Sequence, residues 1–245
     1  MTKSGKTTEP YQKAFADRRR DPDGKREAIL RTAVEMFHNR GYASTSMNEI
    51  AEKLHITKPA LYHYFRNKED ILLECYRWGC ILIREFLDEI ANKGGRGLEK
   101  VESFIRSYIQ LISSEFGRAV IRLDDSELSA VGRSEIRSYK REIDRRLRSF
   151  IREGVDDGSI LECDAKLASF AIAGAINWLS MWYRPGGALT PEEIANGFVT
   201  TFANGLRKPA AGAAPLHLAA AKDKRTADTR IADTRTADTR NRHRR

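Results

Sequence analysis

The stretch SMNEIAEKLHITKPALYHYF, residues 46–65, decides the fold of this chain. Ser46 and Glu49 have the spacing of a capping box, in which each side chain satisfies a free backbone amide at the start of a helix. Thr57 is a suitable cap for a second helix. The predicted helices are 46–53 and 57–64, with a tight turn at His55-Ile56 between them. Two short helices joined in this way form a helix-turn-helix.

The two faces of this predicted motif differ in chemistry. One face is apolar and can hold the second helix against its neighbours; it comprises Ile50, Ala51, Leu54, Ile56, Leu61 and Phe65. The other face offers a cation, hydroxyl groups and an imidazole, on Lys58, Tyr62, His63 and Tyr64. A DNA-binding motif of this kind lays its second helix in the major groove, where such groups reach base edges. The pattern therefore indicates DNA binding.

Helical periodicity continues on both sides of the motif, and no alternating strand pattern is found, so the predicted fold class is all-α with about nine helices. We expect a first helix from Asp21-Pro22 to Gly41 and a long helix after Asn67. Five more are predicted at 97–116, 118–130, 134–157, 164–184 and 190–207. Breaks are expected at Gly94-Gly95, Gly132, Gly158 and Pro185-Gly186-Gly187.

Residues 26–91 resemble the N-terminal domain of the TetR family of bacterial transcriptional regulators. The matching segments are Ile29-Leu30-x-x-Ala33-x-x-x-Phe37, Gly41-Tyr42-x-x-Thr45-Ser46, Ile50-Ala51, Lys53-Leu54, Ile56–Phe65 and Asn67–Leu72. The resemblance implies a three-helix DNA-binding domain at 22–68 and a helical ligand-binding and dimerisation domain at 69–207. It also implies a homodimeric repressor that binds a palindromic double-stranded DNA operator and is released by a small-molecule effector. Repression is the family's usual mode of action.

The same resemblance implies which residues contact DNA. They are Ser46, Lys58, Pro59, Ala60, Tyr62, His63, Tyr64 and Lys68. Lys58 and Pro59 would approach base edges, while Ser46 and Lys68 lie at helix N-termini, where backbone amides bind phosphate. The alternative for Tyr62 is a packed ring with only its hydroxyl exposed, and for the two lysines it is a solvated charge.

One position departs from the family pattern. The family usually has glycine in the turn of the motif, where this chain has His55. The position is expected to need a positive φ, which histidine tolerates better than most non-glycine residues. We therefore expect that the turn costs more free energy with His55 than with glycine and that the motif stays intact. His55 is interpreted as a turn residue and not as a sensory one.

The segment 177–195 resembles a TetR subgroup whose members sense acyl-CoA thioesters. Such a ligand needs an apolar tunnel and cations, but no ligand-binding residue can be assigned from the sequence. Candidate aromatic and basic side chains are Phe104, Tyr108, Trp178, Trp182, Arg118, Arg122, Arg141, Arg145, Arg146 and Arg148. The last two helices, 164–184 and 190–207, carry enough apolar surface to form a four-helix dimer interface. The alternative is that this surface packs within one chain.

The net charge of +9 is unevenly distributed, with the positive excess at the two ends of the chain. Residues 1–21 are predicted to be a disordered basic arm, which either reaches the minor groove through Arg18-Arg19-Arg20 or only aids solubility. Residues 208–245 hold a five-residue repeat, Thr-Ala-Asp-Thr-Arg, with few apolar side chains. They are predicted to be a disordered tail that adds at most non-specific affinity.

Several other functions find no support in the residues. Cys75, Cys80 and Cys163 lack metal-ligand spacing and are interpreted as reduced thiols of a cytoplasmic protein. No uncharged run is long enough for a membrane span. No motif for a catalytic site, a metal or a cofactor stands out, so the chain is predicted not to be an enzyme. The remaining alternatives are a non-specific nucleic-acid-binding helical protein and, less favoured, an enzyme without a recognisable motif.

Overall fold

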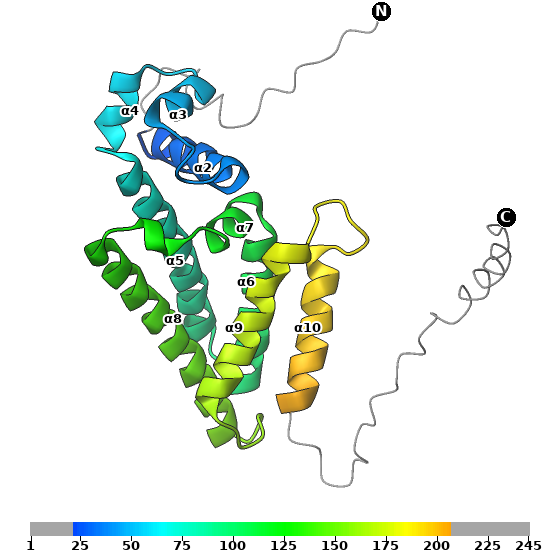
Figure 1. Cartoon of the computed structure of the whole chain (residues 1–245). Helices are drawn as coiled ribbons and strands as arrows, with labels where there is room; N and C mark the ends of the chain where they lie inside the picture. The colour runs from blue at the N-terminus through cyan, green and yellow to red at the C-terminus, as the bar shows by residue number, and fades with distance from the viewer. Residues whose placement is uncertain (1–21, 207–245) are drawn as a thin grey trace, which may run out of the picture. The chain divides into compact units, whose positions relative to one another are not determined.

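The computed structural model describes residues 22–206, and within this range every element is helical. The described residues form nine α-helices and one short 3-10 turn, which confirms the predicted all-α class for this part of the chain (Figure 1). The elements are α2 (Pro22–Arg40), α3 (Met47–Lys53), α4 (Lys58–Tyr64), α5 (Lys68–Lys93), α6 (Gly97–Ser113), α7 (Glu115–Ile121), η1 (Asp125–Glu127), α8 (Ala130–Asp156), α9 (Ala165–Trp182) and α10 (Pro191–Leu206). The predicted arm and tail lie outside the described residues.

The helix starts confirm the capping chemistry expected from the sequence. Ser46 accepts a hydrogen bond from the Glu49 amide at 3.2 Å, and the Glu49 carboxylate accepts one from the Ser46 amide at 2.8 Å. Asn67 accepts from the Asp70 amide at 2.8 Å at the start of α5. Thr57 accepts from the Ala60 amide at 3.4 Å at the start of α4. Because each cap satisfies an amide that has no partner inside the helix, α3, α4 and α5 begin at defined residues.

The turn between α3 and α4 has the backbone conformation that the sequence predicts. His55 has φ 57°, the one positive φ among the described non-glycine residues. Its amide donates to the Glu52 carbonyl at 3.0 Å, and the Ile56 amide donates to the Ala51 carbonyl at 3.0 Å. The turn thus satisfies backbone hydrogen-bonding groups at the end of α3. It does so with His55 in a left-handed conformation that glycine would adopt at lower cost.

The structure corrects the predicted elements between residues 114 and 134. The expected helix 118–130 is wrong: α7 ends at Ile121, and η1 and extended residues follow. The expected break at Gly132 is also wrong, because Ser129 caps α8 and accepts the Gly132 amide at 3.3 Å. Gly132 therefore lies in the first turn of a helix. A serine cap three residues upstream outweighs the weak helix propensity of a single glycine.

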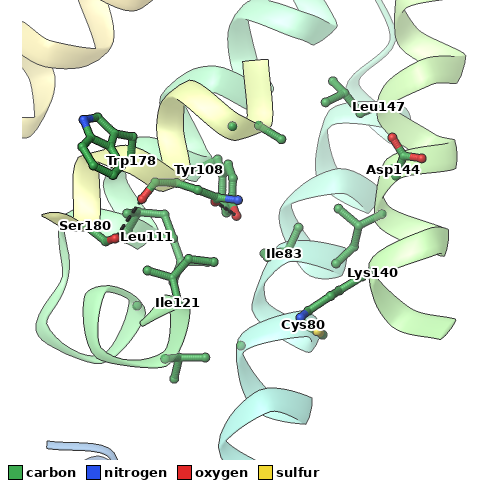
Figure 2. A pocket seen from close by; sticks show the side chains of 18 of the residues that line it. Cys80, Ile83, Tyr108, Leu111, Ile121, Lys140, Asp144, Leu147, Trp178 and Ser180 are labelled. Carbon is green, nitrogen blue, oxygen red and sulfur yellow. Dashed lines mark hydrogen bonds between the residues drawn. The ribbon is translucent and has the colours of Figure 1, made fainter. Parts of the chain in front are cut away.

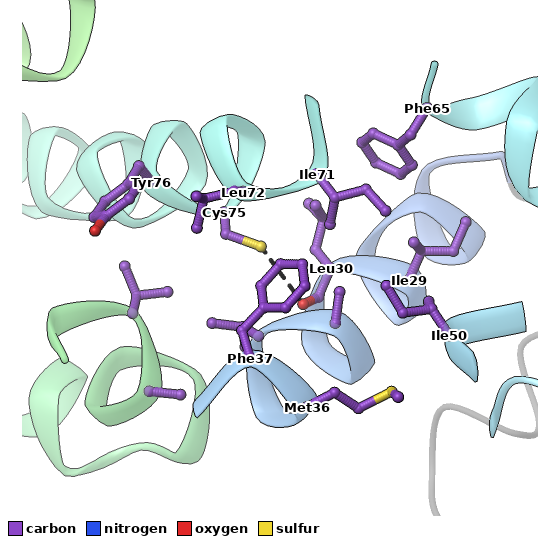
Figure 3. Close-up of a cluster of buried hydrophobic side chains, with 14 of the residues drawn as sticks. Ile29, Leu30, Met36, Phe37, Ile50, Phe65, Ile71, Leu72, Cys75 and Tyr76 are labelled. Atoms are coloured by element: carbon purple, nitrogen blue, oxygen red, sulfur yellow. Dashed lines mark hydrogen bonds between the residues drawn. The ribbon is translucent and has the colours of Figure 1, made fainter. Parts of the chain in front are cut away.

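Two hydrophobic cores share α5, and α8 also contributes to both, with Ile136 in the first and Leu147 in the second. The first joins α2, α3 and α4 to the N-terminal half of α5 and to α7, and Figure 3 shows Leu30, Phe37, Phe65 and Ile71 within it. The second joins α6, α8, α9 and α10 to the C-terminal half of α5 through Leu87 and Ile90. The predicted domain boundary at residue 68 falls where the chain enters α5, so this helix connects the two predicted domains.

The three cysteines are free thiols, two buried and one exposed. The Cys75 thiol donates to the Leu30 carbonyl at 3.7 Å within the first core (Figure 3). Burial raises the pKa of Cys75 above its ordinary value and that of Cys80 to about 11. Both thiols are therefore protonated at neutral pH, as expected for packed side chains with no reactive role.

A close backbone approach fixes the junction between α6 and α7. Ser114 is extended, with ψ 156°, and its hydroxyl accepts the Gly117 amide at 3.0 Å. A Cβ atom on Gly117 would lie 2.0 Å from the Leu111 carbonyl oxygen. No side chain fits at this position without moving one helix away from the other.

We predict that Gly117→Ala destabilises the protein by at least about 2 kcal/mol, because the methyl group would force the α6–α7 junction apart. Urea unfolding followed by circular dichroism measures this change. The matched control is Gly132→Ala, where the new Cβ meets its nearest neighbour, the Leu128 Cβ, at an ordinary 3.4 Å. Equal stability of the two variants would contradict the interpretation of the junction.

Candidate DNA interface and interior cavity

The second helix of the motif, α4, presents the predicted DNA-contacting residues in two groups. Lys58, Pro59, Tyr62 and His63 are exposed, and 42% of Tyr62 is accessible to solvent. Ala60 and Tyr64 are half-buried, and Tyr64 packs against the first core. The opposite, apolar face is buried as expected, with Leu61 fully enclosed. The arrangement leaves a polar and aromatic surface held by a rigid apolar face.

A shallow depression lies between the start of α3 and the start of α4. Its volume is about 370 Å³, and four predicted DNA-contacting residues line it: Ser46, Lys58, Tyr62 and Lys68. The Lys58 ammonium lies 5.8 Å from the centre of the Tyr62 ring. Pro59, Ala60, His63 and Tyr64 are not among the lining residues. A depression with two ammonium groups and a helix start suits a phosphate oxygen.

Lys68 has a structural environment that the sequence does not reveal. Its ammonium donates to the carbonyl oxygens of Tyr42 at 2.6 Å, Thr45 at 2.8 Å and Ala43 at 3.4 Å. It also lies 4.2 Å from the centre of the Tyr42 ring. Since an ammonium has three donors, these carbonyls compete with a DNA phosphate for Lys68. The side chain secures the loop between α2 and α3.

A second site lies inside the C-terminal bundle. A cavity of about 880 Å³ lies between α5, α6, α7, α8 and α9 and is partly open to solvent. Figure 2 shows side chains from all five helices around this space, among them Ile83, Leu111, Ile121, Leu147 and Trp178. The lining is mainly apolar, as is usual for small-molecule sites of this size.

The sequence predicts only part of this lining. Of the named candidates, Phe104, Tyr108, Trp178 and Arg122 line the cavity. The others are not among the lining residues: Trp182, Arg118, Arg141, Arg145, Arg146 and Arg148. The contributions of α5 and α8, such as Ile83 and Leu147, were not found. Helical periodicity marks these residues as buried, but it does not distinguish a packed core from the wall of a cavity.

The cavity holds a few paired polar groups. The Tyr108 hydroxyl donates to the Asn177 side-chain carbonyl at 2.5 Å, and burial raises the pKa of Tyr108 well above its ordinary value. Asp144 accepts from the Ser169 hydroxyl at 2.8 Å and forms an ion pair with Arg148. These groups are satisfied within the chain, and the Asn177 amide nitrogen remains a potential donor to a ligand.

The cavity and the first core share a wall. Val120, on α7, lines the cavity and is also buried in the first core with residues of α2. On the same interface, the Arg31 guanidinium of α2 lies 4.9 Å from the Trp78 ring centre and 5.7 Å from that of Phe116. A change in the cavity that moves α7 is therefore transmitted to α2 by direct contact.

In residues 22–206, no group of three or more His, Cys, Asp or Glu side chains is placed to hold a metal ion. Over the same residues, no helix has the length and apolar character needed to cross a membrane.

Comparison with known proteins agrees with this geometry. Residues 29–75 match the family described as "Bacterial regulatory proteins, tetR family", and residues 94–206 match the one described as "Tetracyclin repressor-like, C-terminal domain". The HTH-type transcriptional repressor KstR2 of Rhodococcus jostii is 28% identical over 207 residues, which cover 79% of this chain and 97% of that protein.

Two solved structures have the same architecture. The crystal structure of AibR in complex with isovaleryl coenzyme A and operator DNA is 29% identical and has a TM-score of 0.65, covering 72% of this chain and 97% of AibR. KstR2 of Mycobacterium tuberculosis has a TM-score of 0.69 at 22% identity, over 76% of this chain and 96% of that one, which shows the shared fold.

The helix-turn-helix, the helical bundle behind it and the two matching families define a DNA-binding transcriptional regulator of bacterial type. The chain belongs to the TetR family. Its N-terminal helices are the family's DNA-binding part, and the helices from α6 onward are its C-terminal domain.

We predict that Lys58→Ala lowers DNA affinity and reduces the slope of log K against log salt by about one, because one positive charge is removed from the DNA interface. Fluorescence anisotropy at several salt concentrations measures the slope. The control is Lys93→Ala, at the C-terminal end of α5. It removes the same charge from an exposed site that is far from α4 along the chain. An unchanged slope for Lys58→Ala would exclude this lysine from the DNA interface.

The variant Lys68→Ala distinguishes a phosphate contact of Lys68 from its hydrogen bonds to the loop between α2 and α3. The sequence predicts the same reduction in salt slope, with weaker binding to all DNA sequences. From the structure we also expect the melting temperature of the variant to fall, because three carbonyl oxygens lose their hydrogen-bond donor. A lower melting temperature with an unchanged salt slope would assign Lys68 to the loop alone.

Proposed function

We propose that the protein is a homodimeric repressor that binds a palindromic operator and is released by a small hydrophobic effector, such as an acyl-CoA thioester. The observation that carries this proposal is the position of the cavity. It is largely apolar, it has the volume of a ligand site, and one of its walls is in direct contact with the DNA-binding helices. A regulator needs these two features to connect ligand binding to DNA binding.

The proposed DNA interface consists of α4 and the start of α3. In it, α4 enters the major groove with Lys58 and Pro59 at base edges, and Ala60 approaches a thymine methyl group. Tyr62, His63 and Tyr64 contact phosphates or bases. The remaining predicted contacts, Ser46 and Lys68, bind phosphate at the starts of α3 and α5.

The proposed dimer rests on the outer face of α9. Exposed apolar side chains recur there at helical spacing: Leu167, Phe170, Trp178, Met181 and Trp182, exposed by 43–65%. Three of them, Phe170, Trp178 and Met181, also line the cavity, so the proposed interface lies beside the cavity opening. A stripe of this size on a single helix is typical of a protein–protein interface. The symmetric partner would place the same stripe against it, and a twofold protein matches a palindromic operator.

The expected contribution of α10 to the dimer is revised by its packing. The apolar side chains that the sequence offers for this interface form one stripe on the last helix: Ile194, Phe198, Phe202 and Leu206. Ile194 is buried in the second core, and Phe198 and Phe202 are half-buried against it. That stripe therefore packs within one chain, which is the alternative considered for it. The side chain of Leu206 lies outside the described residues. In the proposed dimer, α10 offers its outer face, which carries Asn196, Gly197, Thr200, Thr201 and Asn204.

The effector class is proposed from the cavity and from relatives. An acyl chain suits the apolar lining, and the structure of AibR, a relative 29% identical to this chain, is a complex with isovaleryl coenzyme A and operator DNA. The Asn177 amide beside Tyr108 is placed to donate to a carbonyl oxygen inside the cavity. A thioester carries an apolar chain and such an oxygen on the same molecule.

Release follows only if the ligand prefers the conformation that cannot bind DNA. The proposed movement is a tilt of α5 together with α7, which contact both the cavity and the first core. The tilt would change the distance between the two recognition helices of the dimer. In this proposal the protein acts as a regulator in the cytoplasm and has no enzymatic activity.

We expect isovaleryl coenzyme A to raise the melting temperature by about 5 °C or more at a hundredfold excess over its Kd. The same ligand should release the protein from an operator fragment taken from the inverted repeat nearest its gene. Free coenzyme A and isovalerate are the controls. If neither this thioester nor longer-chain acyl-CoAs stabilise the protein or release DNA, the effector class is wrong.

We expect Leu167→Glu to raise the dissociation constant of the dimer at least about tenfold, because twofold symmetry places the buried charge in the interface twice. Sedimentation equilibrium measures this constant. Val131→Glu is the matched control: Val131 is apolar and 78% exposed but lies on α8. A dimer that tolerates Leu167→Glu as well as Val131→Glu would exclude this face of α9.

A further inference from the structure

A group of basic side chains lies where the cavity meets the DNA-binding helices. Arg122, which follows α7, is a lining residue of the cavity, and its guanidinium lies 3.2 Å from the His38 ring nitrogen Nε2 on α2. Arg118 is one turn earlier on α7 and acts electrostatically on His38. Two elements on opposite sides of the predicted domain boundary therefore bring positive charge to one edge of the cavity.

These charges have no acidic partner in the described part of the chain. Among residues 22–206, neither Arg122 nor Arg118 forms an ion pair with a carboxylate, and Arg118 donates to the Ser113 carbonyl at 3.2 Å. The acidic residues that follow Arg122 are engaged elsewhere. Asp124 accepts the Ser126 amide at 2.9 Å, and Asp125 accepts from Lys140 at 3.0 Å.

The state of His38 reflects this surplus of positive charge. Burial, together with the charges of Arg122 and then Arg118, lowers the pKa of His38 below 6.5. The neutral ring can accept a hydrogen bond from the Arg122 guanidinium, whereas a protonated ring would repel it. The three groups are thus arranged as an anion site that contains no anion of the described chain.

Lys140, the other cationic residue that lines the cavity among residues 22–206, has an acidic partner. Lys140 donates to Asp125 and lies 5.5 Å from the centre of the Tyr76 ring, so its charge is already compensated. Of the cationic residues along the cavity wall within residues 22–206, Arg122 is the one without a carboxylate. A ligand with its apolar part in the cavity would meet this guanidinium at the edge nearest α2.

We propose that the effector carries an anionic group, a phosphate or a carboxylate, which binds to Arg122 and His38 and is supported by the charge of Arg118. The inference rests on the proposed function and makes it more specific: the ligand touches the DNA-binding domain directly through His38. An anion at this place draws Arg122 out of its contact with the neutral ring and favours the protonated ring. The packing of α2 against α7 changes as a result.

The test compares two ligands that share an acyl group. Isovaleryl coenzyme A carries phosphates, whereas S-isovaleryl pantetheine is a neutral thioester. For the unmodified protein we expect coenzyme A thioester binding to be at least about tenfold tighter in calorimetry, since charge-assisted hydrogen bonds to the phosphates are gained. We expect Arg122→Gln to abolish most of that difference and to leave binding of the neutral thioester unchanged.

A matched variant and a second readout exclude a general loss of structure. Arg152→Gln removes the same charge from an exposed position of α8 that does not line the cavity, and should behave as the unmodified protein. In NMR titrations the pKa of His38 should rise with isovaleryl coenzyme A and stay unchanged with the neutral thioester. His38→Gln should reproduce the loss of preference if Arg122→Gln fails to fold.

The outcomes separate this inference from the proposed function. If both thioesters bind the unmodified protein and Arg122→Gln with the same ratio of affinities, the anion site is wrong and thioester sensing stands. If neither thioester binds the unmodified protein, the proposed effector class fails, and the anion site falls with it. Isovalerate serves as a third ligand, and a loss of its affinity in Arg122→Gln would identify a carboxylate as the anion recognised.

Discussion

The structure depends on the continuity of α5, which belongs to both hydrophobic cores. Ile71, Leu72 and Cys75 pack against the DNA-binding helices, and Leu87 and Ile90 pack in the bundle three to four turns later. A helix that is buried at both ends behaves as a stiff connector, because bending it costs packing in one core or the other. The position of the recognition helix is therefore tied to the packing of the C-terminal domain, and α7 adds a second connection beside it.

Local chemistry made the N-terminal part predictable. Ser46, Glu49, Thr57 and Asn67 each cap a helix through atoms only two or three residues away, so their effect can be recognised in the sequence. The positive φ of His55 could be anticipated for the same reason, since it follows from a turn of fixed length. Predictions that need only neighbouring residues were confirmed in this region.

The errors and omissions arise where distant segments meet. The sequence did not indicate the kink at Ser114, which depends on contact between the Leu111 carbonyl and Gly117, nor the attachment of Lys68 to the loop at Tyr42. The part of the cavity wall that α5 and α8 supply was missed, because the wall is assembled from five helices and apolar periodicity is the same for a filled and an unfilled interior. The pairing of His38 with Arg122 joins residues 84 positions apart, beyond any local pattern.

The exposed aromatic face of α9 has a consequence for gene control. If that face forms the twofold contact, an isolated chain exposes Trp178 and Trp182 to water, and association removes this cost. Where the dimer is weak, its abundance rises with the square of the chain concentration, so the occupancy of an operator responds more steeply than linearly to expression. A repressor that limits its own synthesis under these conditions would hold its level within a narrow range by mass action alone.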